Sequence, residues 1–550
     1  MAMSASSAAG SNYFGGAAGG VAPGASIVAT TRGINISSSR FVESLFHHAV
    51  EALLAGAVHP RVDVIMYYRA QAVPNDGRAV LDIVTHRVME VYGKPVVQSA
   101  GNAGPAVGTV CGSGGDVLTV GAYTARAAWR ANFGTEIGDA GRVRSYSGRG
   151  PSEDGAPGVS FLAPSGFVSA DLSLTTGPRR LNSSVPYLMP KGYMVGDGTS
   201  QATPAAAGAV ALLISGAKQT RVRYDPRRIA VALLSSAQPL EGYGAHEQGA
   251  GVINVGTAWQ MLKRLVDDPP QIETEGPVRT AWSDRLEKPG RGRGLYERGG
   301  WRVGQREART ITLRRVSGPR GARSYALSWS SNDGTYESPA SVTLPLDVSV
   351  AVNVTIHPKS AGIHSAMLNV IDPKTGALLH HMLHTIIVAE PLTAANRHTF
   401  RQEGKLDLLR ASSFFLEVPE RAGRLRVRLR SREWPITLGV APPLTGYGTP
   451  FTASPPPAAC TETKAKGANS GVEMVCTVER PEDGVCEAYV EYPSPWRADL
   501  QLKSLTRPTR YSVTASVKTL STGRRSAAVP SGPRRTAQGQ AIKRINRKSI

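Results

Sequence analysis

The stretch GDGTSQATPAAAG, from Gly196 to Gly208, places a serine between glycines and a block of small residues. A serine hydroxyl is a nucleophile only when a base removes its proton and hydrogen-bond donors stabilise the oxyanion that forms. Gly198 and Thr199 permit a tight turn before a helix, whose first amides would point towards Ser200. Alone, a Gly-Thr-Ser sequence before a helix is more often a simple helix cap. The stretch therefore raises acyl transfer as a hypothesis.

Four other short segments accompany this one in a fixed order. They are GVAPGA at 20–25, SAGN at 99–102, SGRGP at 147–151 and QGAGVINV at 248–255. Together with GTSQATP at 198–204, they resemble the ordered motifs of the subtilisin-like serine peptidases, the subtilases. The ordered matches identify the chain as a member of that family.

The resemblance to subtilases implies a role for each matching residue. It implies that Ser200 is the nucleophile and that the side-chain amide of Asn102 donates to the oxyanion, a contribution of about 10² to 10³ in turnover. It implies that the substrate lies against Ser99, Ala100, Gly101, Gly198 and Thr199. Neither a metal nor a cofactor is implied.

Among subtilases, the chain is most similar to the tripeptidyl-peptidase II subfamily. Three segments follow that subfamily: Asn75-Asp76-Gly77-Arg78, SGRGPSEDGAPGVSFLAP from Ser147, and GLYERGG from Gly294. The resemblance implies an exopeptidase that releases tripeptides from the free N-termini of peptides. It also implies a cytoplasmic location and a homo-oligomer assembled through the β domains.

The aspartate and histidine of the subtilase triad, which precede the serine in this family, are not found. The segment MSASSAAGSNYFGG occupies the place of the small residues that follow the family's histidine, so both residues are expected upstream of Met1. His47, His48 and Asp63 lack the family's motif context and are not expected to substitute. The chain, which looks truncated at both ends, is therefore expected to be inactive on its own.

Two alternatives remain open. The first is a non-catalytic subtilase homologue that binds peptides or assembles with active subunits. The second is an endo-acting peptidase, because the subfamily binds the substrate's amine with two glutamates, and GINISSSRF and YYRAQ stand at those places. A cation at Arg69 would repel an ammonium group.

Composition limits the possible partners. The net charge is +21, and residues 501–550 hold 12 Lys or Arg and no Asp or Glu, as in a disordered basic tail. No nucleic-acid-binding module is recognised, so nucleic acid is not expected as a partner. No apolar run reaches the roughly 18 to 20 residues that span a bilayer, and no signal peptide is recognised, so a soluble protein without a membrane partner is expected. The four cysteines are expected to be reduced and packed: Cys111, Cys460, Cys476 and Cys486.

The first half of the chain alternates between helical and strand patterns. Residues 39–57 have a helical apolar face, and continuous apolar runs at 62–66, 97–100, 117–123 and 159–164 are typical of strands buried on both faces. The predicted fold class is α/β, a subtilisin-like parallel sheet flanked by helices and followed by β-sandwich domains.

Strict alternation marks the second half. It is clearest at 348–356, and a hairpin is predicted over 364–389. Arg424 to Arg430 alternate with apolar residues, so one strand face is cationic, either solvated or a docking face for an acidic partner. The predicted domains are a peptidase domain at 1–265, a linker at 266–300, a β-sandwich at 301–392, a second β-rich domain at 393–515 and a disordered tail at 516–550.

Overall fold

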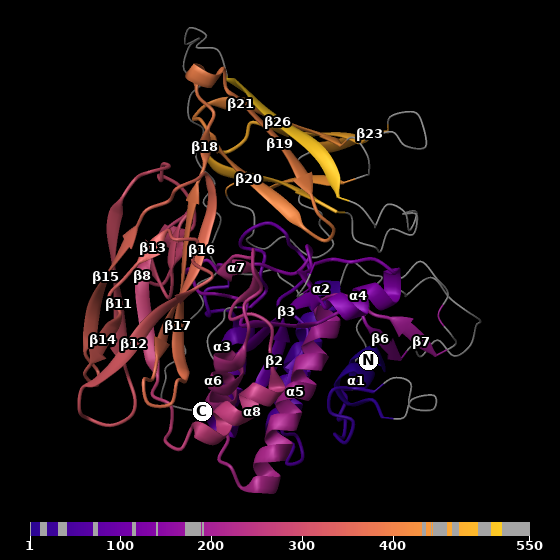
Figure 1. Ribbon diagram of the computed structural model, residues 1–550, viewed down its shortest axis with the longest axis vertical. Coiled ribbons are helices and arrows are strands. Elements are labelled where there is room, and N and C mark those ends of the chain that lie inside the picture. Colours follow the sequence, from indigo (N-terminus) through magenta and orange to yellow (C-terminus); the bar gives the residue numbers. More distant parts are fainter. Residues whose placement is uncertain are drawn as a thin grey trace, which may run out of the picture.

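The structure, a computed structural model, consists of an α/β domain with two β-rich domains packed against it (Figure 1). The described residues are 2–11, 19–30, 41–69, 75–112, 117–138, 141–170, 189, 192–431, 436–441, 443, 459–464, 472–492 and 508–519. Most of the predicted basic tail therefore lies outside the described residues. Within the described ranges, no helix is both long and apolar enough to cross a bilayer.

The sheet of the α/β domain is mainly parallel. Its strands are β1 (Ile65–Tyr67), β2 (Val96–Ser99), β3 (Leu118–Thr124), β5 (Phe161–Pro164) and the antiparallel β4 (Arg142–Val143). A separate hairpin pairs β6 (Val168–Ala170) with β7 (Tyr193–Val195). The four apolar runs of the sequence thus coincide with the four parallel strands, within a few residues at their ends.

Helices cover both faces of this sheet. Val96 packs in one cluster with Leu53 and Val88, whereas its neighbour Val97 packs in another with Val210, because successive strand side chains point to opposite faces. The helices are α1 (Ala2–Ala9), α2 (Phe41–Val58), α3 (Val80–Tyr92), α4 (Arg126–Phe133), α5 (Thr199–Thr220), α6 (Pro226–Ser236), α7 (Ala245–Gln248) and α8 (Val255–Arg264). The predicted helix at 39–57 is α2, with Ala49 and Leu53 fully buried.

Helix α5 crosses the centre of the domain and explains its run of small residues. A Cβ atom on Gly208 would lie 2.7 Å from the carbonyl oxygen of Ala8, so α1 and α5 can approach this closely only without a side chain there. Pro204 is the sixth residue of α5 and lies beyond its first turn. Because proline has no amide proton, it cannot donate to the carbonyl of Ser200.

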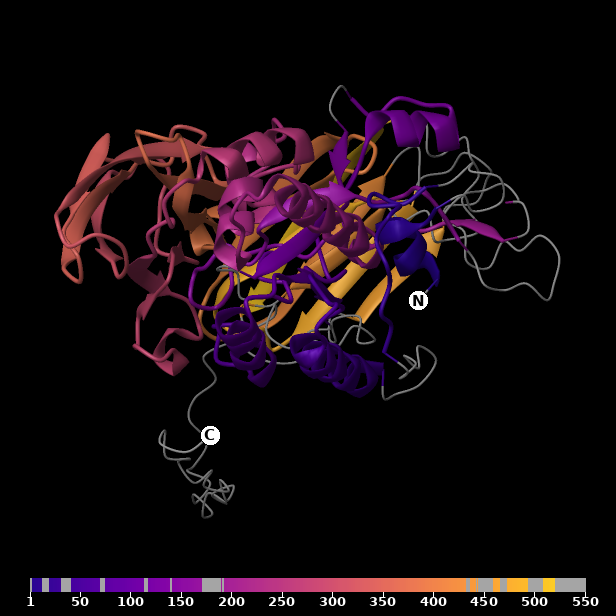
Figure 2. The same cartoon turned by 90° about the horizontal axis from the view of Figure 1, so that it is seen from below.

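The first β-rich domain is a ten-stranded sheet that curls until β14 and β15 lie against each other (Figures 1 and 2). Its strands are β8 (Ile272–Arg279), β9 (Arg291–Gly292), β10 (Leu295–Glu297), β11 (Glu307–Arg315), β12 (Arg323–Ser330), β13 (Tyr336–Glu337), β14 (Ser341–Leu344), β15 (Ser349–Ile356), β16 (Gly362–Ile371) and β17 (Leu378–Val388). The hairpin predicted over 364–389 is β16–β17. Short 3-10 turns occur at η1 (Ser283–Arg285) and, further along the chain, η2 (Ala394–Asn396).

The prediction of a linker at 266–300 is wrong. Strand β8 pairs with β11, and β10 pairs with β8 and β17, so this segment lies inside the sheet. The segment was predicted to be a linker because its composition is polar. Its charged side chains are instead accommodated in the sheet by ion pairs with neighbouring strands. Glu275 binds Lys288 and Arg291, and buried Glu297 binds Arg309.

The second β-rich domain is a sandwich of two sheets. One has the order β18 (Glu390–Pro391), β20 (Ala411–Val418), β25 (Gly484–Glu491), β22 (Thr437–Ala441); the other has β19 (Thr399–Leu406), β26 (Thr509–Thr519), β21 (Ala422–Ser431), β24 (Val472–Glu479), β23 (Ala459–Lys464). The predicted boundary at 515 is too early, because β26 continues to Thr519 with Val517 buried. Lys518 and other polar residues lie on the outer side of this strand, and for that reason its last residues were assigned to the disordered tail.

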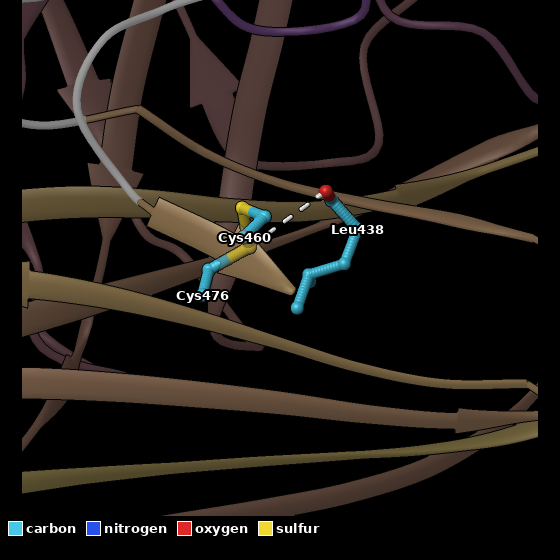
Figure 3. Close-up of a disulfide and its surroundings, with 3 residues drawn as sticks. All are labelled: Leu438, Cys460 and Cys476. Carbon is cyan, nitrogen blue, oxygen red and sulfur yellow. Dashed lines mark hydrogen bonds between the residues drawn. A yellow bond between two sulfur atoms is a disulfide. The ribbon is translucent and has the colours of Figure 1, made fainter. Parts of the chain in front are cut away.

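The expectation of four reduced cysteines is also wrong for two of them. Cys460 on β23 and Cys476 on β24 are direct antiparallel partners and form a disulfide (Figure 3), whereas the thiols of Cys111 and Cys486 are reduced and buried. Sγ of Cys476 lies 3.9 Å from the carbonyl oxygen of Leu438 on the facing sheet. The 16-residue separation reveals no pairing in the sequence, because strand register alone brings the two residues together.

Replacing Cys460 by serine should lower the free energy of unfolding by about 3 kcal/mol under oxidising conditions. The disulfide joins residues 16 positions apart, and closing a loop of that length restricts the unfolded chain by about this amount. Cys460 is exposed, so the serine adds no buried polar group. Urea unfolding of both proteins measures the difference. With a reducing agent present, the two curves should coincide; a difference that persists there would mean that the disulfide is not its cause.

Candidate active site

Ser200 lies at the start of α5, where the chain turns from β7 of the separate hairpin into the helix. Gly198 has φ 93° and ψ 162°, a conformation open almost only to glycine. The Ser200 side chain is half-buried, and within the described part of the chain nothing accepts its amide proton. The hydroxyl and an unpaired helix-terminal amide are therefore presented together, as an oxyanion site requires.

Asn102 is oriented by Thr199. Its Oδ1 accepts hydrogen bonds from the Thr199 amide at 2.9 Å and from Thr199 Oγ1 at 2.8 Å. The Nδ2 group, the donating end, is thereby left for another acceptor. An ideal Cβ on Gly198 would lie 3.3 Å from this Nδ2 and 3.7 Å from the Ser200 amide nitrogen. The two donors thus border one small space next to Gly198, which the absence of a side chain there leaves empty.

Ser99, Ala100 and Gly101 are buried and bonded inside the domain. Ser99 Oγ accepts from the Arg69 amide, the Ala100 carbonyl accepts from the Cys111 amide, and the Gly101 carbonyl accepts from the Gly148 amide. These bonds fix the loop that carries Asn102. Contact of the three residues with substrate stays a prediction.

Asp197, which the sequence analysis did not single out, holds the turn before Ser200 in place by hydrogen bonds. Its carboxylate accepts from Arg144, from the Tyr146 hydroxyl, from Ser165 Oγ at 2.9 Å and from the Gly198 amide at 2.9 Å. The side chains of Asp197 and Arg144 are 1% and 3% exposed. Its position directly before Gly198 was the one sequence signal that could have drawn attention to this buried charge.

Gln201 fixes the first turn of α5 to β6 and to the loop before it. Its Oε1 accepts from the Gly166 amide at 2.8 Å, and its Nε2 donates to the Phe167 carbonyl at 2.8 Å and to Ser169 Oγ at 2.6 Å. The residue is fully buried. It therefore supports the orientation of Ser200 by hydrogen bonds where an apolar side chain would act by packing alone.

The predicted repulsion of an ammonium group by Arg69 is not supported by the structure. The Arg69 guanidinium donates to both carboxylate oxygens of Asp82, and each side chain is 2% exposed. A buried ion pair of this kind presents little net charge to a substrate. The other predicted difference, at residues 33–41, falls almost entirely outside the described residues.

The three residues rejected as substitute triad members have other partners. His47 lies 3.8 Å from Glu43, His48 bonds Thr30, and Asp63 accepts from Lys218. Among the described residues, no side chain hydrogen-bonds Ser200 Oγ. Likewise, no group of three or more His, Cys, Asp or Glu side chains in these ranges could hold a metal ion.

Glu153 is linked through Asn75 to the end of the loop that carries Asn102. Its carboxylate accepts from the Asn75 amide, and Asn75 Nδ2 donates to the Val110 carbonyl at the end of that loop. Burial raises the pKa of the Glu153 carboxyl to about 8, opposed by its hydrogen bonds to backbone amides. The group is therefore largely protonated at neutral pH in the folded protein.

Replacing Glu153 by glutamine should remove part of the pH dependence of stability. With a folded pKa near 8 and an ordinary unfolded pKa near 4.5, the folded state binds more protons between these values, so stability falls as pH rises through this window. The wild type should lose on the order of 3 kcal/mol between pH 5 and 8 from this group, and Glu153→Gln should not. Urea unfolding of both proteins at each pH measures the free energy of unfolding. If it changed with pH equally in the wild type and in Glu153→Gln, the raised pKa of Glu153 would be contradicted.

Two parts of the chain match known protein families. Residues 2–251 match the model of the subtilase family, and residues 273–388 match that of an Ig-like domain in actinomycete serine proteases. Residues 2–251 therefore form a subtilase domain, the domain of a family of serine peptidases. The sequence-based prediction of family and of an α/β fold followed by β-rich domains is confirmed.

Within that family, the chain is similar to tripeptidyl-peptidase 2. The Drosophila melanogaster protein is 34% identical over 252 residues, which are 44% of this chain and 16% of that protein. Pyrolysin from Pyrococcus furiosus is 28% identical over 423 residues, 69% of this chain and 27% of that protein. A crystal structure of tripeptidyl peptidase 2 has a TM-score of 0.63 at 20% identity and covers 94% of this chain and 39% of that one. The chain spans less than a third of the length of the curated relatives that it matches.

Proposed function

We propose that the protein is a tripeptidyl-peptidase that releases tripeptides from the free N-termini of peptides, with Ser200 as nucleophile. The supporting observation is the shared space next to Gly198, bordered by the Asn102 amide group and the Ser200 amide. In this mechanism Ser200 Oγ attacks the scissile carbonyl, and both donors bind the oxyanion in a site that is already ordered. The similarity to tripeptidyl-peptidase 2 supports the choice of substrate.

A second candidate is a non-catalytic subtilase that binds peptides or assembles with other subunits. It is favoured by one observation: among the described residues, no base hydrogen-bonds the Ser200 hydroxyl. Without a base a serine hydroxyl has little nucleophilicity at neutral pH. The two candidates therefore differ in whether a general base reaches Ser200 in the working protein.

A fluorophosphonate probe separates these candidates, because it reacts with activated serines and spares ordinary ones. The protein purified from its source is treated with the probe, and the modified residue is located by mass spectrometry. Peptidase function requires modification of Ser200 in the folded protein and none after heat denaturation. Absence of labelling would support the non-catalytic homologue.

A nine-residue peptide with a free or an acetylated N-terminus then tests exopeptidase specificity. A tripeptidyl-peptidase should release the first three residues as one fragment from the free peptide and leave the acetylated peptide intact, because it must bind the free amine. Cleavage of both peptides at internal sites would instead support the endo-acting alternative. Mass spectra at early times identify the first product.

We further propose a cytoplasmic homo-oligomer assembled through the β domains, by analogy with the subfamily. Disulfides are uncommon in reducing cytosol, so the Cys460–Cys476 bond is an observation against this location. Trapping free thiols in intact cells before lysis would distinguish the two: an alkylated Cys460 supports the cytoplasm and an unmodified one an oxidising compartment. Light scattering of the purified protein measures its assembly.

A further inference from the structure

The sheet β19-β26-β21-β24-β23 has one face that the peptidase function does not use. The facing sheet, through Glu487 on β25, accepts a hydrogen bond from the Val107 amide of the α/β domain, so this five-stranded sheet lies on the far side of the sandwich (Figure 1). Its inner face is apolar, with Leu425, Val427 and Leu429 fully buried. No described helix or strand packs against the outer face.

Strand register places the charged residues of β19, β26, β21 and β24 on the outer face. Eight are cationic: Arg401, Lys405, Arg424, Arg426, Arg428, Arg430, Arg510 and Lys518. Three are acidic: Glu403, Glu473 and Glu479. We call this set the basic face. It has an excess of five positive charges, whereas a merely solvated sheet surface would mix both signs more evenly.

Half of these cations have no acidic partner. Arg401 pairs with Glu403, Arg424 with Glu479, and Arg428 and Arg430 share Glu473. Lys405, Arg426, Arg510 and Lys518 are exposed and form no ion pair in the described part of the chain. Their mutual repulsion is relieved only when an anion binds, so the face favours an anionic partner.

The spacing of the arginines indicates the shape of that partner. Arg424, Arg426, Arg428 and Arg430 alternate along β21, so neighbouring guanidinium groups start about 6.8 Å apart and the row spans about 20 Å. Alternate side chains of an extended peptide have the same repeat. At one end of the face, a cavity of about 570 Å³ is lined by Arg401, Arg430 and Arg510 together with Glu403 and Glu473. Arg401 and Arg430 pair with these two glutamates, so Arg510 is the cation of this lining that is left for a ligand carboxylate.

We propose that the basic face binds an extended acidic polypeptide segment in which carboxylate side chains recur at alternate positions. Six of the eight cations are arginines, whose planar groups bind carboxylates through two parallel hydrogen bonds. Single-stranded nucleic acid is the less favoured polyanion, because the outer positions of the described strands include no aromatic side chain on which bases could stack.

Fluorescence anisotropy tests the proposal with two labelled peptides of equal composition, (Glu-Ser)₈ and Glu₈Ser₈, at low ionic strength. The face variant replaces the four unpaired cations by glutamine, so no acid loses its partner: Lys405, Arg426, Arg510 and Lys518. The control variant makes the same change at four exposed arginines outside the face: Arg221, Arg264, Arg320 and Arg323. All three proteins keep the basic C-terminal residues, whose contribution therefore cancels. Circular dichroism confirms that each variant is folded.

The wild type and the control variant should bind (Glu-Ser)₈ with equal affinity, and the face variant about tenfold or more weakly, since four attractive contacts are lost. The alternating peptide should bind more tightly than Glu₈Ser₈. Equal binding by all three proteins would overturn the assignment of the face. Equal affinity for both peptides would overturn the matched spacing.

Two further measurements fix the class and place of the ligand. A (dT)₁₆ strand that displaces (Glu-Ser)₈ and loses affinity in the face variant would overturn the polypeptide assignment in favour of single-stranded nucleic acid. A carbodiimide joins carboxylates to amines, so it should cross-link (Glu-Ser)₈ to Lys405 and Lys518, as located by mass spectrometry. Cross-links only to lysines elsewhere would overturn the proposed location.

Discussion

Replacing Ser200 by alanine should reduce the turnover of peptide hydrolysis by about 10⁶-fold in a protein that supplies the missing base, the expected loss when a serine peptidase loses its nucleophile. The side chain is half-buried and no described residue depends on its hydroxyl for a hydrogen bond, so the variant should keep its stability. Ser215→Ala, an exposed change on the same helix, is the matched control and should retain full turnover. Comparable turnover in Ser200→Ala and wild type would exclude Ser200 as the nucleophile.

The same assay distinguishes the two functions of the Asn102 amide. Asn102→Asp keeps an oxygen that can accept from Thr199 but removes the donating Nδ2 group, whereas Asn102→Ala removes both. Each should lower kcat by about 10² to 10³ with a small change in KM, because the donor acts on the transition state. If Asn102→Asp retained the wild-type kcat, the side chain would serve only to hold the turn.

Replacing Asp197 by alanine lowers the free energy of unfolding by about 3 to 5 kcal/mol, because it leaves the Arg144 guanidinium buried without its counter-charge. The Tyr146 hydroxyl, Ser165 Oγ and the Gly198 amide lose their acceptor at the same time. Urea unfolding measures the loss. Because the turn that presents Ser200 depends on these bonds, fluorophosphonate labelling should fall as well.

An exposed ion pair in the same chain provides the control for this prediction. Arg424 and Glu479 lie 2.7 Å apart, with side chains 54% and 60% exposed. Glu479→Ala should cost less than about 1 kcal/mol, since water solvates both charges. A similar cost for Glu479→Ala and Asp197→Ala would show that burial does not govern the strength of these pairs. Asp197→Asn adds a further comparison, as it keeps the shape of the side chain and removes its charge.

Local patterns in the sequence predicted the elements of the fold. Continuous apolar runs marked the four parallel strands, because strands buried on both faces cannot alternate. The period-two pattern at 348–356 marked β15, whose Val352, Val354 and Ile356 are buried. The ordered motifs indicated the family and the candidate residues Ser200 and Asn102. They could be recognised in the sequence because a tight turn requires glycines and short polar residues at fixed positions within a few residues of one another.

Pairing between distant residues required the tertiary structure. Strand register joined Cys460 to Cys476 and brought β8 to β11 across a segment predicted to be a linker. Burial placed Asp82 beside Arg69, which removed the repulsion that the sequence alone suggested. Folding also brought distant donors to Asp197, from the segment of Arg144 and Tyr146 and from Ser165. A sequence specifies which side chains are charged, but only the folded chain decides which charges meet, because that depends on contacts between residues far apart along it.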